Sequence, residues 1–165
     1  MSLQEVQNRP LVLGVITVSD TRTPATDKGG DTVVELLEAA NHIVKVRTLL
    51  PDDANSIMEV LDRWISIESL DGIILTGGTG IAYRDVTIEA VSAMIEKEIP
   101  GFGEFFRYLS LTEDIGTRAM ASRALAGVAR KVLIFALPGS VGAVTLGMNR
   151  LILPEINHLV YEVTK

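Results

Sequence analysis

The chain of 165 residues has no cysteine and only two histidines, and these absences narrow the chemistry open to it. Without cysteine there is no disulfide bond, no thiolate nucleophile and no cysteine-based zinc site, which fits a reducing cytoplasm. His42 follows a predicted helix end and His158 lies in the last predicted helix, so we interpret both as structural. The chain is therefore short of the bases and nucleophiles of a hydrolytic triad.

Basic clusters and long apolar runs are also missing. The formal charge is −6 and no cluster holds five or more lysines and arginines, which argues against nucleic acid as the main partner because its phosphates require a basic face. No run approaches the ~18 apolar residues of a membrane span, and no apolar signal core opens the chain. We therefore expect a cytoplasmic protein that binds neither nucleic acid nor membrane.

Apolar residues make up 47% of the chain, and only 22% of its residues are charged. At this length such a composition is typical of one well-packed domain. Residues 1–10 are mostly polar, and we predict a flexible N-terminal arm there. A single domain is predicted over residues 11–165.

Apolar runs predict the strands of this domain. Residues 11–19 and 72–75 are nearly continuous apolar runs, as in strands that are buried on both faces. Residues 43–50 alternate between apolar and charged positions and predict a less buried strand. Two further strands, residues 125–128 and 132–137, are predicted to be joined by a turn around Ala129 and Arg130.

Helical spacing separates most of these strands, over residues 31–40, 57–65 and 88–95 and again after residue 140. Asp31 is a candidate cap for the first helix, and Trp64 lies on an apolar stripe that we interpret as core. Strands that alternate with helices predict an α/β fold: three layers, α/β/α, around a mainly parallel, Rossmann-like sheet.

A glycine-rich loop, Thr76–Gly80, follows the run at residues 72–75 and precedes a predicted helix. Glycines reach positive φ at little cost and a helix N-terminus adds partial positive charge, so this order suits an anion, with Arg84 as a nearby cation. The spacing matches neither a Walker A loop nor a dinucleotide fingerprint. Two interpretations stay open: a phosphate-binding loop, or a tight turn with Asp85 or Thr87 as the helix cap.

Four loops follow predicted strands and are expected to line one pocket, because open α/β sheets place ligands at the carboxyl edge. These loops are residues 19–30, 51–53, 76–87 and 138–140. They are rich in carboxylates and phosphate donors, which fits metal-assisted phosphoryl or nucleotidyl transfer better than hydrolysis by a triad.

Several residues of these loops have two interpretations each. Asp52 and Asp53 stand before a helix, and capping explains only one of them, while the other could share a divalent cation with Asp85. Ser140 is either a helix cap or a phosphate donor.

The largest aromatic concentration is at Phe102, Phe105 and Phe106. We interpret these side chains as packing, either in the core or at a subunit contact, rather than as a ligand cage.

Four spaced motifs resemble the molybdenum cofactor biosynthesis family that includes MoaB, MogA and the G domain of gephyrin. They are Thr76–Gly80 with Arg84-Asp85-Val86-Thr87, then Pro100-Gly101-Phe102-Gly103-Glu104, then Ser122-Arg123, then Leu137-Pro138-Gly139-Ser140. They occur in order from about Leu11 to the C-terminus, and the segment from Leu109 to Val128 is most similar to the MoaB branch.

The resemblance implies a molybdopterin-binding domain with a MogA/MoaB-like fold, assembled as a homo-oligomer, a trimer or a hexamer. It implies adenylylation of molybdopterin with ATP and Mg²⁺, with release of pyrophosphate, and other proteins of the pathway as partners. The family's two essential aspartates fall on Asp52 and Asp85, as catalytic residues and magnesium ligands. The implied molybdopterin and nucleotide site comprises Ser19, Asp20, Thr76, Gly77, Gly78, Thr79, Gly80, Arg84, Ser110, Ser122, Pro138, Gly139 and Ser140.

Two other functions compete with adenylylation. One is a carrier or assembly subunit that binds molybdopterin without catalysis. The other is an unrelated nucleotide-binding oxidoreductase, against which the missing dinucleotide fingerprint argues.

Overall fold

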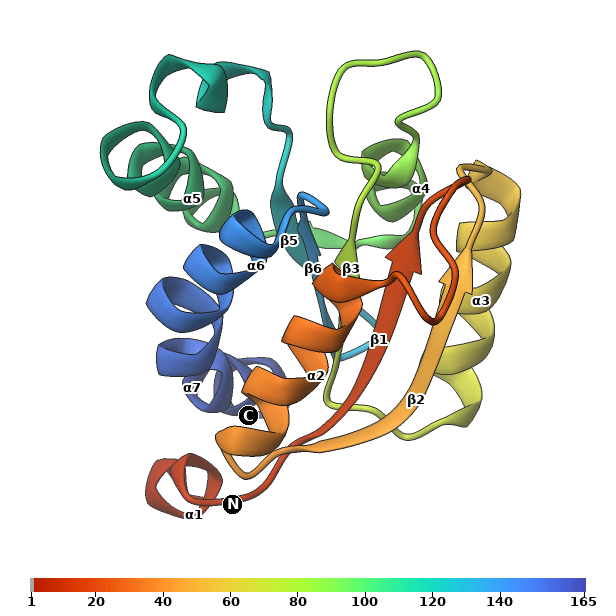
Figure 1. Ribbon diagram of the computed structural model, residues 1–165. Coiled ribbons are helices and arrows are strands. Elements are labelled where there is room, and N and C mark those ends of the chain that lie inside the picture. Colours follow the sequence, from red (N-terminus) through yellow and green to blue (C-terminus); the bar gives the residue numbers. More distant parts are fainter. Residues whose placement is uncertain (1) are drawn as a thin grey trace.

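A computed structural model describes residues 2–165, which are built around one six-stranded sheet (Figure 1). The strands lie in the order β2-β1-β3-β6-β5-β4. The first four in this order are parallel to one another, whereas β5 is antiparallel to β6 and β4 to β5. The strands are β1 (Val12–Val18), β2 (Ile43–Leu50), β3 (Gly72–Thr76), β4 (Lys97–Glu98), β5 (Leu125–Ala129) and β6 (Val132–Leu137). The predicted, mainly parallel sheet is confirmed.

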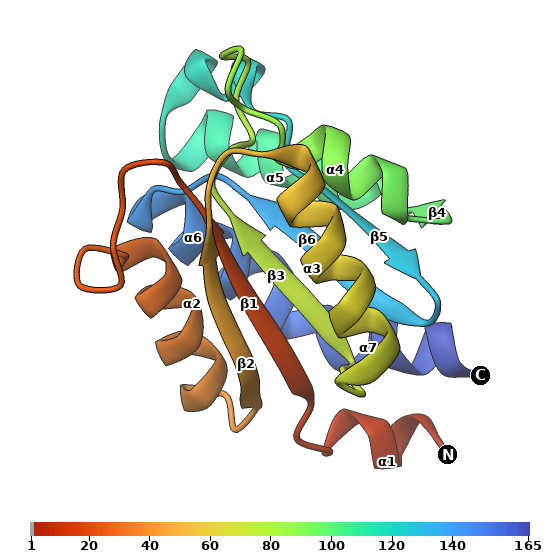
Figure 2. The same cartoon turned by 90° about the vertical axis from the view of Figure 1, so that its right-hand side faces the viewer.

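Helices cover both faces of the sheet, which confirms the three layers (Figures 1 and 2). α2, α5, α6 and α7 cover one face, and α3 and α4 cover the other. The helices are α1 (Leu3–Gln7), α2 (Lys28–Ala39), α3 (Ala54–Ile67), α4 (Thr87–Met94), α5 (Pro100–Glu113), the 3-10 helix η1 (Gly116–Ala121), α6 (Val141–Gly147), the π-helix η2 (Met148–Ile152) and α7 (Leu153–Thr164). No helix within residues 2–165 combines the length and apolar character that crossing a bilayer requires.

The central strands divide their side chains between two cores. Successive residues of a strand point to opposite faces, so Ile74 packs in the core under α2 and α7 while Ile73 and Leu75 pack under α3 and α4. This explains the continuous apolar runs of the sequence, because a strand covered on both faces has no side that favours polar residues. Trp64 is 5% exposed in the second core, as predicted.

The connections diverge between β1 and β3. From β1 the chain runs through α2, over one face, to β2 at one edge of the sheet, whereas from β3 it runs through α4, over the other face, to β4 at the opposite edge (Figure 2). Adjacent strands whose connections leave in opposite directions create a crevice at their carboxyl ends.

Part of the segment that was predicted as a flexible arm is helical. α1 begins with a capping box formed by Ser2 and Glu5, and Val6 is 1% exposed against α7. The Arg9 guanidinium also donates to the Asp71 carboxylate at 2.9 Å. Packing therefore begins before residue 11; the part of the predicted arm at Met1 lies outside the described residues.

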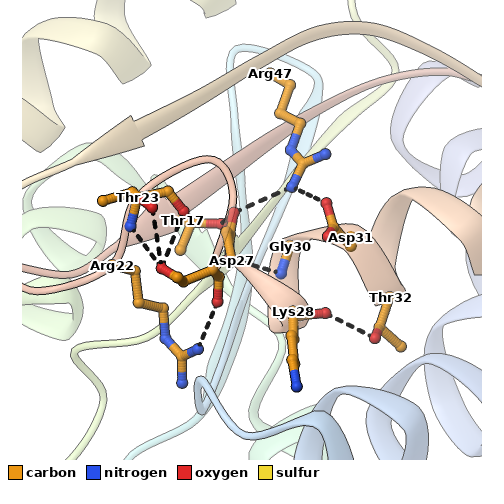
Figure 3. A network of polar contacts seen from close by, with 10 residues as sticks. Thr17, Arg22, Thr23, Asp27, Lys28, Gly30, Asp31, Thr32 and Arg47 are labelled. Carbon is orange, nitrogen blue, oxygen red and sulfur yellow. Dashed lines mark hydrogen bonds and ion pairs between the residues drawn. The ribbon is translucent and has the colours of Figure 1, made fainter.

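α2 begins three residues before its predicted cap, Asp31, because Asp27 is the N-cap. The Asp27 carboxylate accepts from the Gly30 amide at 3.0 Å, from the Thr17 hydroxyl at 2.7 Å and from Arg47 at 3.1 Å (Figure 3). Arg47 also donates to Asp31 at 2.7 Å. Since Asp27 is 2% exposed, this network fixes the loop after β1 against β2 from inside the domain.

The hairpin between β5 and β6 turns one residue later than predicted. Arg130 and Lys131 have φ of 47° and 67°, so they are the two central residues of the turn rather than Ala129 and Arg130. Positive φ at both positions matches the right-handed twist of the two strands.

Candidate functional site

The loops after β1, β2, β3 and β6 meet at the carboxyl edge of the sheet, at the top of Figure 1. The Ser19 amide donates to the Leu50 carbonyl at 2.8 Å, which joins the first two loops. The Gly77 amide donates to the Leu137 carbonyl at 2.9 Å, and the Thr76 hydroxyl to the Pro138 carbonyl at 3.0 Å. The four loops expected to line one pocket therefore lie together.

The glycine loop requires glycine at two positions. Gly77 and Gly78 have φ of 96° and 68°, a region that side chains disfavour. A Cβ on Gly77 would overlap the Val18 carbonyl, and one on Gly78 would overlap the Thr87 hydroxyl. That hydroxyl donates to the Gly77 carbonyl at 2.8 Å and so holds the loop against α4.

The predicted cap of α4 at Asp85 or Thr87 is wrong. The N-cap is Val86, whose side chain makes no capping hydrogen bond, and the Thr87 amide instead donates to the loop at the Gly78 carbonyl (3.1 Å). Within residues 2–165, no protein acceptor takes the amide hydrogens of residues 78–80. Unpaired amides in such a loop are groups that bind anions.

The two aspartates after β2 divide the roles that the sequence left open. Asp53 caps α3 by accepting from the Ser56 amide at 2.8 Å. Asp52 instead faces the loop after β1: its carboxylate accepts from the Asp20 amide at 3.1 Å, and its amide donates to the Asp20 carboxylate at 2.8 Å. A Cβ on Gly78 would lie 3.3 Å from Asp52 Oδ1, so this carboxylate also borders the glycine loop.

Burial raises the pKa of Asp52, and the charges of Asp20 and Asp85 raise it further, against the Asp20 amide and the Arg84 cation, which lower it. The carboxylates of Asp20 and Asp85 are thus each close enough to repel that of Asp52. Burial is the larger cause of this raised pKa, and a bound cation would reduce the part that comes from the neighbouring carboxylates.

Asp85 borders the end of the glycine loop. Its Oδ2 accepts from the Ala82 amide at 2.9 Å and lies against Gly80. The neighbouring Arg84 is exposed and makes no ion pair within the described chain.

A divalent cation fits these residues as a shared ligand site rather than a complete cage. No group of three or more histidine, cysteine or acidic side chains within residues 2–165 is arranged to hold a metal ion. Mg²⁺ is usually held by one or two carboxylates together with substrate phosphates and water. The donor chemistry of Asp52 and Asp85 matches that requirement.

Two predicted hydroxyls organise their loops. Ser19 Oγ accepts from the Arg22 amide at 3.0 Å, and Ser140 Oγ caps α6 by accepting from the Ala143 amide at 3.1 Å. An oxygen that accepts keeps its own proton, so Ser140 can cap a helix and also donate to a ligand. Gly139 lies against the backbone of Gly77, which closes the edge between β3 and β6.

The remaining predicted serines lie on the α5 side. Ser110 is buried within α5, and no hydrogen bond in the described structure joins its side chain to the four loops. Ser122 ends η1, and its carbonyl accepts from Arg107.

Arg123 borders the site although the sequence did not predict it as a site residue. Its Nε donates to the Gly80 carbonyl at 2.8 Å, its Nη2 donates to the Asp85 carbonyl at 3.0 Å, and it pairs with Glu89. Only its place in a family motif pointed to it, because backbone acceptors leave no sequence signal. Beside it an open pocket of about 340 Å³ is lined by Ile81, Ala82, Tyr83, Asp85, Val86, Glu89 and Arg123.

Known proteins are similar to this chain in sequence and in fold. Residues 14–158 match the model of a family described as a probable molybdopterin binding domain. A Molybdenum cofactor biosynthesis protein B from Staphylococcus carnosus is 56% identical over 160 residues, which are 96% of this chain and 94% of the relative.

Solved structures agree with the sequence relatives. A crystal structure of a Molybdenum cofactor biosynthesis protein B has a TM-score of 0.91 and 48% identity, with 94% of this chain and 96% of that one covered. The tungsten cofactor synthesizing protein MoaB from Pyrococcus furiosus has a TM-score of 0.84 and 35% identity, with 95% and 99% covered. The chain therefore belongs to the molybdopterin-binding domain family of molybdenum cofactor biosynthesis proteins.

Proposed function

We propose that this protein acts in molybdenum cofactor biosynthesis by binding molybdopterin and joining to it the adenylyl group of ATP. One observation carries the proposal: the Asp52 carboxylate borders a glycine loop whose amides at residues 78–80 have no acceptor in the described structure. Groups that attract a cation and groups that attract an anion thus share one sheet edge. A metal-bound nucleotide satisfies both.

The reaction matches the scarcity of general bases. An oxygen of molybdopterin's terminal phosphate would attack the α-phosphorus of ATP, and the bond to the bridging oxygen of the β-phosphate would break as pyrophosphate leaves with the electron pair. The attacking phosphate is ionised at neutral pH, so no base has to remove a proton. Positioning and electrostatics would then supply most of the rate, as in other phosphoryl-type transfers.

The residues of the edge divide this work. Amides 78–80 and Arg84 would bind phosphate oxygens, and the Ser140 hydroxyl would donate from the facing loop. Asp52 and Asp85 would hold Mg²⁺, which when bound neutralises part of the phosphate charge. The Asp20 amide donates to the Asp52 carboxylate and so fixes its orientation beside the loop after β1.

Replacement of the two carboxylates tests the proposal, with pyrophosphate release from Mg-ATP and fresh molybdopterin as the assay. We expect Asp52→Asn and Asp85→Asn to lower turnover by about 100-fold or more and to change molybdopterin affinity by less than about threefold, because both act on the reacting phosphates. Asp53→Asn is the matched control, since asparagine also caps helices. Equal losses of turnover and pterin affinity would contradict the assigned roles.

A non-catalytic molybdopterin carrier is the second candidate, because the free amides of residues 78–80 suit the pterin phosphate whether or not a reaction follows. This candidate predicts that the wild-type protein binds molybdopterin and releases no pyrophosphate at any Mg²⁺ concentration. Release that depends on Asp85 rules it out.

We also propose a homo-oligomer, a trimer or a hexamer, formed through α5 and η1. Phe102 and Phe106 are core residues, whereas Phe105, Tyr108 and Met120 are 61%, 64% and 87% exposed. An exposed apolar group of this kind marks an interaction surface, and it borders a hollow of about 350 Å³. Light scattering should give a multiple of the 17.8 kDa chain, and Met120→Glu should lower it. A monomeric wild type would refute this assembly.

A further inference from the structure

The loop between the glycines and α4 makes little contact with the domain core. Residues 81–84 are all exposed, and the Tyr83 side chain is fully so. Inside the loop, the Asp85 amide donates to the Ala82 carbonyl and the Ala82 amide donates to the Asp85 carboxylate, both at 2.9 Å. Segments with so few buried contacts open locally unless another element holds them.

Arg123 holds both ends of this loop. Its guanidinium reaches the Gly80 carbonyl, where the loop leaves the glycines, and the Asp85 carbonyl, where it enters α4. The Arg123 amide donates to the Thr79 carbonyl at 3.0 Å. The planar fork of arginine fixes two acceptors at once, which a single lysine ammonium does less well.

Arg123 is itself held from two sides. Its guanidinium pairs with Glu89 on α4, a bond that also lowers the pKa of Glu89. The segment that carries it is fixed by Arg107 of α5, which donates to the Ala124 carbonyl at 2.9 Å. The contacts of Arg123 therefore connect the loop to α4 and α5, which lie on opposite faces of the sheet.

We infer that Arg123 is a positioning residue, which sets the Asp85 carboxylate and the free amides of residues 78–80 relative to one another. It acts through the carbonyls of Gly80 and Asp85. Only the effect of Arg123 on catalysis rests on the proposed function. The closed conformation of the loop, in which Arg123 joins both of its ends, follows from the hydrogen bonds alone.

Hydrogen–deuterium exchange tests the closed loop without any activity. We expect Arg123→Ala to speed exchange in peptides covering residues 79–87 by about tenfold, with peptides of β3 and β6 unchanged. Arg123→Lys should show an exchange rate between those of wild type and Arg123→Ala, because a single ammonium replaces a guanidinium that bonds two carbonyls. Arg130→Ala, which removes an exposed ion pair with Asp62, is the control and should leave the loop unchanged.

Pyrophosphate release tests the consequence. We expect Arg123→Ala to lower kcat by about 10- to 100-fold with KM within about threefold, and Arg123→Lys to restore part of kcat. Wild-type exchange in the loop of Arg123→Ala, or unchanged kcat in a protein with a loosened loop, would overturn the inference. If the wild-type protein releases no pyrophosphate, the proposed function is refuted instead. Hydrogen–deuterium exchange in the loop and the affinity for molybdopterin then still test the role of Arg123. Should Arg123→Ala fail to fold, Arg123→Lys carries both measurements.

Discussion

Replacement of Asp27 should cost the domain a large part of its stability. Asp27→Ala removes the α2 cap, worth about 1 kcal/mol, and leaves the buried Thr17 hydroxyl without its acceptor, which costs about 1–3 kcal/mol. The Arg47 bond adds little because Arg47 is partly exposed and keeps Asp31. Loss of the carboxylate's own desolvation cost offsets part of the sum. We therefore expect a fall of about 2–3 kcal/mol in the free energy of unfolding.

Urea unfolding at pH 7 measures this change, with an unchanged m-value as the sign of an intact two-state transition. Asp27→Asn keeps the cap acceptor and removes the charge, so it should cost about 1–2 kcal/mol. Asp31→Ala removes only an exposed partner of Arg47 and should stay within about 0.5 kcal/mol of wild type. An Asp27→Ala protein as stable as Asp31→Ala would refute the reasoning, because the buried network would then contribute nothing.

Three further changes should have distinct outcomes. The folded protein raises the pKa of Asp52, so the ionised carboxylate destabilises the fold at pH values above the ordinary aspartate pKa. Asp52→Asn should therefore have a urea midpoint at pH 7 equal to or above that of wild type while activity is lost, and a lowered midpoint would contradict this. Gly77→Ala should cost about 2 kcal/mol or more, because its φ is positive and its Cβ would meet the Val18 carbonyl, whereas Gly101→Ala, in open space within α5, should stay within about 1 kcal/mol. Burial lowers the pKa of His42, which accepts a backbone N–H, so stability is complete above about pH 6.5 and falls as pH drops below it; His42→Gln should flatten that slope between pH 7.5 and about 5.5 in urea titrations.

The strands and the position of the site followed from the sequence because both depend on patterns that burial imposes. Strands covered on two faces leave continuous apolar runs, and loops at their carboxyl ends necessarily share an edge. Capping was less predictable. Either Asp52 or Asp53 could cap α3, and only the fold selects Asp53, because the Asp20 amide holds its neighbour elsewhere.

The errors arose where long-range contacts replaced a local signal. α4 begins without a side-chain cap because Thr87 bonds to the glycine loop instead. α2 begins early because Asp27 is also an acceptor for β1 and β2, which a local reading of helical spacing does not reveal. Arg123 binds carbonyls 43 and 38 positions away, and every residue type offers a carbonyl.

The contact between the loops after β3 and β6 at the carboxyl edge has a consequence during synthesis. Thr76 and its acceptor Pro138 are 62 positions apart, so the glycine loop lacks one wall until β6 and the loop after it have also left the ribosome. A nascent chain that ends before β6 has the loop sequence and no finished crevice. In a series of C-terminally truncated chains of increasing length, ligand binding should therefore appear only when the chain includes β6. Binding would thus report that this last parallel strand has been inserted into the sheet.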